Sequence, residues 1–172
     1  MFHQGDKASV TTGLVIRKAT AADATAIGDM VAEFQTYLRG LGDMTEFDFG
    51  ADRYLRDGFG DDPAFEGLVA ERETGVDGYL LYHFGYDTDI GRRLVFIIDL
   101  YVREGARQRG IGTALMKRAA ELGQARGAEV MIWSVFEANA AALRFYETLG
   151  ATPVKGLRFM SMATRALDGL TP

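Results

Sequence analysis

The sequence predicts one α/β (α+β) domain in which helices flank a central sheet, and three observations support this prediction. The chain has 172 residues, the length of one ordinary domain. Apolar residues make up 48% of it and charged residues 25%, which is typical of a globular domain rather than a disordered, collagen-like or coiled-coil chain. In its second half, two strands that are apolar on both faces enclose one amphipathic helix, which is the pattern of a strand–helix–strand unit.

The first predicted elements are a strand and a helix. The strand is expected at Leu14–Arg17, and Thr20 is placed to cap the helix that follows. Gly40 ends that helix, and a short helical piece is expected around Ala51–Arg56 within an acidic, glycine-rich stretch. The long helix is recognised from apolar residues at helical spacing, namely Ala24, Ile27, Met30, Val31, Phe34 and Leu38.

Three strands follow in succession. They are predicted at Gly67–Glu71, Gly78–Tyr86 and Arg93–Val102, with turns at residues 73–75 and 87–91. Strict alternation assigns the third strand two faces, one with Leu94, Phe96, Ile98, Leu100 and Val102 and the other with Val95, Ile97, Asp99 and Tyr101. A strand that is apolar on both faces belongs in the middle of a sheet covered by helices.

The C-terminal half begins with the strand–helix–strand unit. A helix is expected at Ile111–Arg126 and a second two-sided strand at Glu129–Phe136, so this strand and the one before the helix should be parallel. A further helix is predicted at Asn139–Leu149. The chain is then expected to finish as a hairpin of two strands, Thr152–Val154 and Arg158–Met162.

Composition excludes several classes of site and partner. Cysteine is absent and only His3 and His83 are present, so thiolate chemistry is excluded and no metal site is expected. The net charge of −5 argues against nucleic acid as the main partner. Residues 1–13 are polar and are expected to form a loose arm before a domain at residues 14–172, with neither a signal peptide nor a membrane helix. A cytoplasmic protein is the resulting expectation.

The turn at Arg107–Thr113 is the most informative stretch of the sequence. It stands where a buried strand gives way to a helix, and Gly110 and Gly112 allow a ligand to approach the backbone closely. The first amides of a helix have no partner within the helix and lie at the positive end of its dipole, so they favour a pyrophosphate. Arg107 and Arg109 would add positive charge. A tight structural turn remains the alternative from these residues alone.

The residues around this turn resemble the GNAT superfamily of N-acetyltransferases. The resemblance rests on Arg107-x-x-Gly110-x-Gly112, on Asp99-Leu100-Tyr101-Val102 before it, and on Asn139 and Phe145-Tyr146-Glu147-x-Leu149-Gly150-Ala151 after it. It implies a mixed, mostly antiparallel sheet flanked by helices, with a splayed parallel strand pair in its middle. It also implies acetyl-coenzyme A as co-substrate and no metal.

The same resemblance implies which residues hold the co-substrate. The pantetheine arm would be lined by the main chain of Leu100, Tyr101 and Val102, and the pyrophosphate would be held by Gln108, Arg109, Gly110, Ile111, Gly112 and Thr113, with Arg107 beside them. Asn139, Ala140, Ala141, Ala142 and Phe145 would contact it from the next helix.

Shorter motifs are similar to the diamine branch of that family, which includes spermidine/spermine and thialysine acetyltransferases. They are Asp57-Gly58-Phe59-Gly60-x-x-Pro63, Leu68-Val69-Ala70-Glu71, Gly78-Tyr79-x-x-Tyr82 and Tyr86-Asp87-x-x-Ile90-Gly91. Ile98 stands where the branch has an acidic residue, and Leu157 lies closest to an expected tryptophan. The branch implies a small primary amine as acceptor and a homodimer, with neither nucleic acid nor membrane as partner.

Two residues are candidates for catalysis. By resemblance, Tyr146 is the general acid that protonates the leaving thiolate, and an ordinary packing aromatic is the alternative. Asp99 interrupts an apolar strand, where a carboxylate is costly unless it is paired. Asp99 is expected to take the proton of the amine through water, to hold the cationic substrate, or to be a structural carboxylate.

Further residues have weaker roles in this hypothesis. Glu137 matches an acidic position of the branch, and His83 is expected to be a packing or surface residue. Five acidic residues could ring the acceptor mouth with negative charge, although such charge is more usually a solvated surface; they are Asp43, Glu46, Asp48, Asp87 and Asp89. A protein or peptide N-acetyltransferase, and a non-catalytic acyl-CoA-binding module on the same fold, are the alternative functions.

Overall fold

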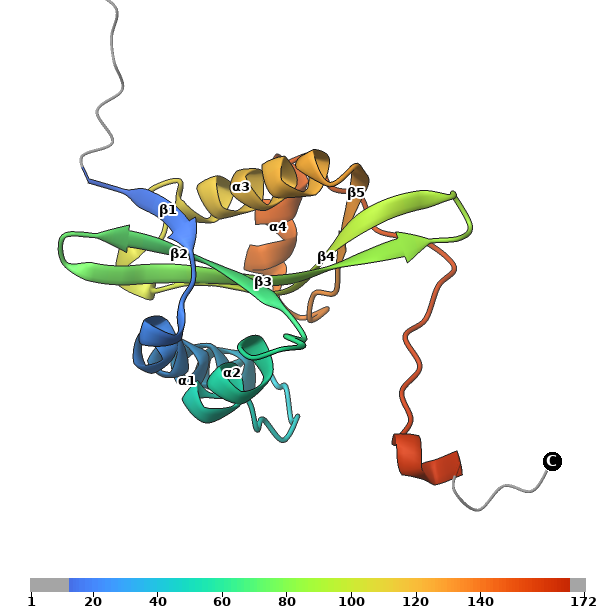
Figure 1. Ribbon diagram of the computed structural model, residues 1–172, viewed down its shortest axis with the longest axis horizontal. Helices are drawn as coiled ribbons and strands as arrows, with labels where there is room; N and C mark the ends of the chain where they lie inside the picture. Colours follow the sequence, from blue (N-terminus) through green and yellow to red (C-terminus); the bar gives the residue numbers. More distant parts are fainter. Residues whose placement is uncertain (1–12, 168–172) are drawn as a thin grey trace, which may run out of the picture.

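In the computed structural model, which describes residues 13–167, a twisted sheet separates two helical layers (Figure 1). The sheet order within those residues is β1-β2-β3-β4-β5. All neighbouring strands are antiparallel except the pair β4 and β5, which is parallel. The bounds of the strands are Val15–Lys18 (β1), Glu66–Arg72 (β2), Gly75–Asp87 (β3), Arg92–Val102 (β4) and Ala128–Trp133 (β5). The predicted mixed, mostly antiparallel sheet is therefore confirmed.

The helices cover the two faces of the sheet separately. Figure 1 shows α1 (Ala24–Gly40) and α2 (Ala51–Gly58) on one face, and α3 (Ile111–Ala125) and α4 (Ala140–Thr148) on the other. Each layer has its own apolar cluster. The α1 side buries Ile27, Met30, Tyr54, Val69, Tyr79 and Leu81, and the α3 side buries Leu68, Leu80, Val95, Ile97 and Leu115. Alternate residues of β2 and β3 thus serve opposite clusters, as the period of a strand requires.

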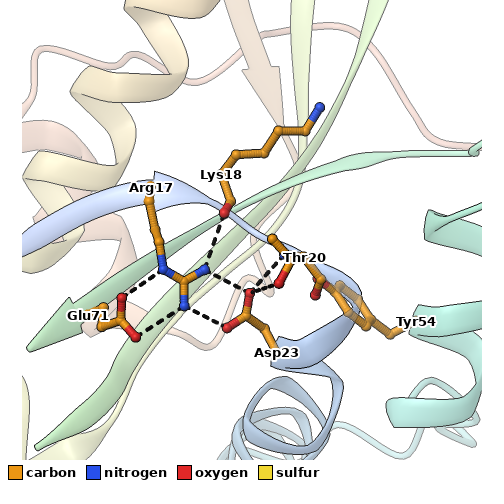
Figure 2. A network of polar contacts seen from close by, with 6 residues as sticks. All are labelled: Arg17, Lys18, Thr20, Asp23, Tyr54 and Glu71. Atoms are coloured by element: carbon orange, nitrogen blue, oxygen red, sulfur yellow. Dashed lines mark hydrogen bonds and ion pairs between the residues drawn. The ribbon is translucent and has the colours of Figure 1, made fainter.

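A partly buried charge network fixes the start of α1 against the sheet. Arg17 donates to both carboxylate oxygens of Asp23, each at 2.8 Å, and its Nε donates to Glu71 on β2 at 2.7 Å (Figure 2). Asp23 also accepts from the amide of the predicted cap residue Thr20 at 2.8 Å, while the Tyr54 hydroxyl donates to the Thr20 carbonyl at 2.9 Å. The network therefore ties β1, β2, the first turn of α1 and α2 together.

The parallel strands β4 and β5 separate part of the way along. They pair from Arg93↔Ala128 to Ile97↔Trp133, and β4 continues to Val102 without β5 beside it. On the β3 side, Leu81 pairs with Asp99 and Tyr82 with Ile97, so Ile98 is an inserted bulge residue. The sheet therefore opens between β4 and β5, as the predicted splayed pair requires.

The bulge corrects the predicted faces of β4. Strict alternation placed Leu100 with Phe96, and Tyr101 with Ile97. In the structure, Leu100 packs with Ile97 on the α3 side and Tyr101 packs on the α1 side. The inserted residue Ile98 shifts the alternation by one position, which reverses the direction of every side chain after it.

The end of the chain differs from the predicted hairpin. Residues 151–163 form no strand, so the expected strands Thr152–Val154 and Arg158–Met162 are wrong for this structure. The segment leads away from the sheet to a short 3₁₀ helix at Thr164–Leu167 (Figure 1). No strand of residues 13–167 pairs with it, because the sheet ends at β5. β5 itself begins one residue earlier and ends three residues earlier than expected, and the predicted N-terminal arm lies outside the described residues except for Gly13.

Candidate active site

The turn between β4 and α3 leaves a row of main-chain amides free. The amides of residues 108–113 donate no main-chain hydrogen bond within residues 13–167, and the next amide, that of Ala114, donates to the Gly110 carbonyl at 2.9 Å. Gln108 and Gly110 have positive φ angles of 61° and 77°, as in turns whose successive amides converge on an anion. The positive end of the α3 dipole adds to the attraction. The turn therefore fits a phosphate group.

Close packing of α4 holds this turn. A Cβ on Gly112 would lie 3.1 Å from Cζ of Phe145, so the absence of a side chain lets α3 and α4 approach each other. At Gly110 a Cβ would meet nothing within 4 Å, which leaves open space above the amides. Glycine is thus required at the two positions for different reasons: Gly112 admits the neighbouring helix α4, and Gly110 adopts the left-handed conformation.

The two arginines of the turn differ in their surroundings. The Nε of Arg107 donates to the Val102 carbonyl at 3.0 Å, and its guanidinium lies 5.1 Å from the ring centre of Tyr37 and 5.5 Å from that of Tyr101. Arg107 is therefore oriented toward α1 by cation–π contacts. Arg109 is exposed on the turn itself. Arg109 is the better placed of the two to add charge beside the free amides.

The second part of the site is the open edge of β4. Beyond Ile97, the side of β4 that faced β5 has no strand beside it, and this edge comprises Ile98–Val102. Main-chain groups there can bond to an extended polar ligand as a neighbouring strand would. This edge leads directly to the free amides of the following turn.

Asp99 is held at this opening by a buried tyrosine. The hydroxyl of Tyr79, a fully buried residue of β3, donates a hydrogen bond to Oδ2 of Asp99. Burial raises the pKa of Asp99 to about 6, although the hydrogen bonds from Tyr79 and from the Leu100 amide lower it. Asp99 therefore titrates close to neutral pH, which suits a group that binds or accepts a proton.

Tyr146 lies on the other side of the opening. Its ring centre is 4.9 Å from that of Trp133 on β5 and 5.2 Å from that of Phe145. Burial raises the pKa of Tyr146 to about 12, and the charge of Asp99 adds to the rise. The phenol is therefore protonated at neutral pH, and it is close enough to Asp99 for the two groups to interact electrostatically. Tyr146 therefore packs as an ordinary aromatic residue and also carries a proton that it could donate.

Asn139 links the two helical layers. Its side-chain oxygen accepts from the Ala142 amide at 3.1 Å, which caps α4, and from the Tyr37 hydroxyl of α1 at 2.9 Å. Asn139 is buried, so its first role is to fix where α4 begins. The neighbouring residues Ala140 and Ala141 are exposed at that helix start.

The weaker candidates lie elsewhere. His83 stacks on Phe96 with ring centres 5.1 Å apart, as expected for a packing residue. The expected acidic ring is not formed, since its members occupy two separate places. Asp43, Glu46 and Asp48 lie in the loop after α1, and Asp87 and Asp89 lie at the tip of the β3–β4 hairpin, which Figure 1 shows apart from that loop. Glu137 is exposed before α4.

Two residues near the site were missed at the level of sequence. The hydroxyl of Tyr79 donates to Asp99, and the hydroxyl of Tyr37 donates to Asn139. Tyr79 was noticed only as part of a motif, and its strand position opposite Tyr101 follows from a register that the sequence does not specify. The available signal was Tyr79 itself. A tyrosine on an otherwise apolar strand needs a partner for its hydroxyl, and the neighbouring strand carries Asp99.

The mixed sheet, its opening between β4 and β5, and the free amides beside that opening define an acyltransferase fold. The family model described as "Acetyltransferase (GNAT) family" matches residues 29–151. Thialysine N-epsilon-acetyltransferase from Sus scrofa is 34% identical, over 91% of this chain and 98% of that protein. The spermidine/spermine N(1)-acetyltransferase-like protein 1 from Homo sapiens is 31% identical, over 79% of this chain and 20% of its own length.

A solved structure supports the same fold. An integron cassette protein from the mobile metagenome of V. cholerae superposes with a TM-score of 0.74 at 21% identity, over 91% of this chain and 96% of that one. The chain belongs to the GNAT acetyltransferase family and is an acetyltransferase. Acetyltransferases of this family use acetyl-CoA. In residues 13–167, no helix is long and apolar enough to cross a membrane.

Proposed function

We propose that this acetyltransferase transfers an acetyl group from acetyl-CoA to a primary amine of a small molecule, such as a diamine, a polyamine or a lysine-like compound. The observation that carries the proposal is the row of free amides at residues 108–113, which continues the open edge of β4. Thialysine and spermidine/spermine enzymes among the similar proteins support the choice of a small amine.

The residues available for acetyl-CoA fit its chemistry. The amides of residues 108–113, with Arg109 beside them, would hold the pyrophosphate. The main chain of Leu100–Val102 would bond to the pantetheine arm, and residues 140–142 at the start of α4 would contact it nearby. When bound, acetyl-CoA supplies an electrophilic thioester carbonyl and a thiolate leaving group.

Asp99 would act on the amine. A primary alkyl amine has a pKa near that of lysine, about 10.4, so it arrives as an ammonium ion. The carboxylate of Asp99, ionised above its pKa of about 6, attracts this cation and accepts its proton, directly or through one water. The neutral amine then attacks the carbonyl carbon, forming a C–N bond as the C–S bond breaks.

Tyr146 would act on the leaving sulfur. Its phenol carries a proton at neutral pH because burial and Asp99 raise its pKa to about 12. A hydroxyl in this state donates a hydrogen bond to the developing thiolate and delivers a proton to it, and the proton on Asp99 is available to restore the local balance. In this scheme Asp99 accepts the proton that the amine loses, and Tyr146 donates the proton that the thiolate gains.

Three experiments test the proposal. Calorimetry should detect coenzyme A binding in the micromolar to low millimolar range, and no binding at millimolar ligand contradicts it. A panel of diamines, polyamines, lysine analogues and short peptides then reports the acceptor, with peptide-only turnover favouring a protein N-acetyltransferase. Replacing Tyr146 by Phe removes only the hydroxyl, so kcat should fall about 10²–10⁴-fold with coenzyme A affinity nearly unchanged.

The predicted homodimer remains a prediction of the resemblance to the diamine branch. It does not enter the reaction steps above, all of which use residues of one chain.

A further inference from the structure

Tyr37 on α1 contacts both elements that frame the candidate active site. Its hydroxyl donates to Oδ1 of Asn139, the residue that caps α4, at 2.9 Å. Its ring centre lies 5.1 Å from the guanidinium of Arg107, which immediately precedes the free amides of the turn. The ring also stacks on Phe34 of the same helix, with ring centres 6.5 Å apart. One side chain of α1 is therefore held by its own helix and contacts two separate parts of the site.

The bond to Asn139 joins one helical layer to the other. Figure 1 shows α1 and α4 on opposite faces of the sheet, so paired strands would stand between the two helices. β4 and β5 pair only as far as Ile97 and Trp133, and Asn139 follows the end of β5 in the chain. The bond therefore forms at the end of the sheet where these two strands have separated.

The neighbouring bonds fix which end of the Asn139 carboxamide faces Tyr37. A main-chain amide can only donate, so the atom 3.1 Å from the Ala142 amide is the carboxamide oxygen, and the same oxygen accepts from Tyr37. Nδ2 of Asn139 has no hydrogen-bond partner within residues 13–167. No sealed side-chain nitrogen or oxygen of those residues lacks a partner, so Nδ2 reaches accessible space. Tyr37 thus holds the carboxamide in the orientation that caps α4.

The cap matters because α4 has no deeply buried anchor. None of the residues Ala140–Thr148 is buried. Its packing contacts include Phe145 against Gly112 and Tyr146 against Trp133. Tyr146 lies about two turns beyond the cap on the same hydrogen-bonded helix, so a shift at the cap displaces its hydroxyl as well. A misplacement of ~1 Å at a reacting group can cost about 100-fold in rate.

We propose that Tyr37 is a positioning residue for acetyl transfer. Its hydroxyl fixes Asn139 and with it the start of α4, and its ring steadies Arg107 at the start of the turn. The inference rests on the proposed function, in which Tyr146 and the free amides act on acetyl-CoA. It assigns no contact between Tyr37 and the reacting atoms: a residue of one helical layer sets the geometry of groups in the other.

Two substitutions of Tyr37 separate its two contacts. Tyr37→Phe removes the hydroxyl and keeps the ring, so kcat should fall about 2–10-fold, the range for one lost hydrogen bond, with coenzyme A affinity nearly unchanged. Tyr37→Leu should lower kcat as much and also raise the dissociation constant of coenzyme A about 2–5-fold, because the cation–π contact to Arg107 is lost. Wild-type kcat in Tyr37→Phe contradicts the inference.

Thr36→Ala is the matched control for the loss of a hydroxyl from α1. The hydroxyl of Thr36 donates to the Ala32 carbonyl of the same helix at 2.9 Å, so its removal leaves both contacts of Tyr37 in place. We expect kcat and coenzyme A affinity of Thr36→Ala to match the wild type. A fall in kcat equal to that of Tyr37→Phe would assign the effect to α1 in general and overturn the inference.

A double-mutant cycle with Tyr146→Phe tests whether Tyr37 acts through α4. If Tyr37 positions the hydroxyl of Tyr146, adding Tyr37→Phe to Tyr146→Phe should lower kcat by less than about twofold, because the positioned group is already absent. An equal fall in both backgrounds would reflect a general loss of structure, and it would overturn the inference.

Hydrogen exchange of the Ala142 amide, followed by NMR, tests the inference without using activity. This amide donates to Oδ1 of Asn139, so it should exchange about 2–10-fold faster in Tyr37→Phe than in wild type or Thr36→Ala. Unchanged exchange in Tyr37→Phe contradicts the inference. If Tyr146→Phe turns over like the wild type, the acid role in the proposed function fails, and this exchange rate alone decides the role of Tyr37. The two failures are therefore distinguishable.

Discussion

Replacing Tyr79 by Phe should shift the pH dependence of acetyl transfer, and the structure gives the size of the shift. The Tyr79 hydroxyl donates to Asp99, whose pKa burial has raised to about 6. A hydrogen bond to a charged group contributes about 1.5–3 kcal/mol, and one pKa unit corresponds to ~1.36 kcal/mol. Removing the donor should therefore raise the pKa of Asp99 by about 1–2 units, to between about 7 and 8.

The sign follows from which form of Asp99 is active. In the proposed reaction only the carboxylate attracts the ammonium and accepts its proton, so activity should be lost as pH falls through the pKa of Asp99. At pH 7 the wild-type carboxylate is largely ionised, whereas a pKa between about 7 and 8 leaves roughly a half to a tenth of it ionised. We expect kcat/KM of Tyr79→Phe to fall about 2–10-fold at pH 7 and to recover above pH 9.

The assay is a pair of kcat/KM profiles between pH 5 and pH 10 with the same amine. Protonation of the amine affects both profiles equally, so the displacement between them reports the enzyme. Tyr54→Phe is the control, because Tyr54 is a buried tyrosine of the same cluster whose hydroxyl donates to the Thr20 carbonyl instead. Superimposable profiles for Tyr79→Phe and wild type would refute the reasoning, as would an unchanged Asp99 carboxyl titration measured by NMR.

Three further predictions concern the same elements. Gly110→Ala places a side chain at φ 77°, so coenzyme A affinity measured by calorimetry should fall about 5–30-fold, from ~1–2 kcal/mol of strain, whereas Gly105→Ala should bind normally. Asp99→Asn should abolish the acid limb of the profile near pH 6 and lower kcat/KM at pH 8 at least ~10-fold, and retention of that limb assigns it elsewhere. Arg17→Met should lower the free energy of unfolding in urea by about 3 kcal/mol at pH 7, near the low end for a buried pair because Arg17 is 31% exposed. The hydrogen bond from Arg17 lowers the pKa of Asp23 below 3.8. The stability difference between wild type and variant should therefore be full above about pH 4 and shrink as pH falls further.

The main features of the fold follow from local patterns in the sequence. Alternation and helical spacing predict the four helices and the five strands of residues 13–167 to within a few residues, because each pattern matches the face that the element buries. The parallel pair β4 and β5 follows from two apolar strands that enclose a helix. The turn at residues 107–113 was also predicted, because Gly110 and Gly112 stand where a two-sided apolar strand gives way to a helix.

The remaining features depend on contacts that local patterns do not encode. The hydroxyl of Tyr79 reaches Asp99 only because β3 and β4 adopt one register across a bulge. Arg107 lies beside the predicted anion site in sequence, and its contact with the ring of Tyr37 on α1 joins residues that no local pattern links. Residues 151–163 carry a strand pattern but pair with no strand of residues 13–167, and a local pattern does not specify whether a partner strand is within reach.

The bulge at Ile98 connects the fold to the chemistry. If β4 alternated strictly, Asp99 would follow Val95 and Ile97 into the apolar cluster beneath α3, where an ionised carboxylate has no partner. The inserted residue turns Asp99 toward Tyr79 instead, and it falls where β4 and β5 cease to pair. One extra residue therefore places a carboxylate on the α1 side of the sheet, beside the unpaired edge of β4, while Tyr146 packs on the α3 side. Under the proposed function, an amine and a thioester that approach from opposite faces would meet there, with Asp99 and Tyr146 each acting from its own helical layer.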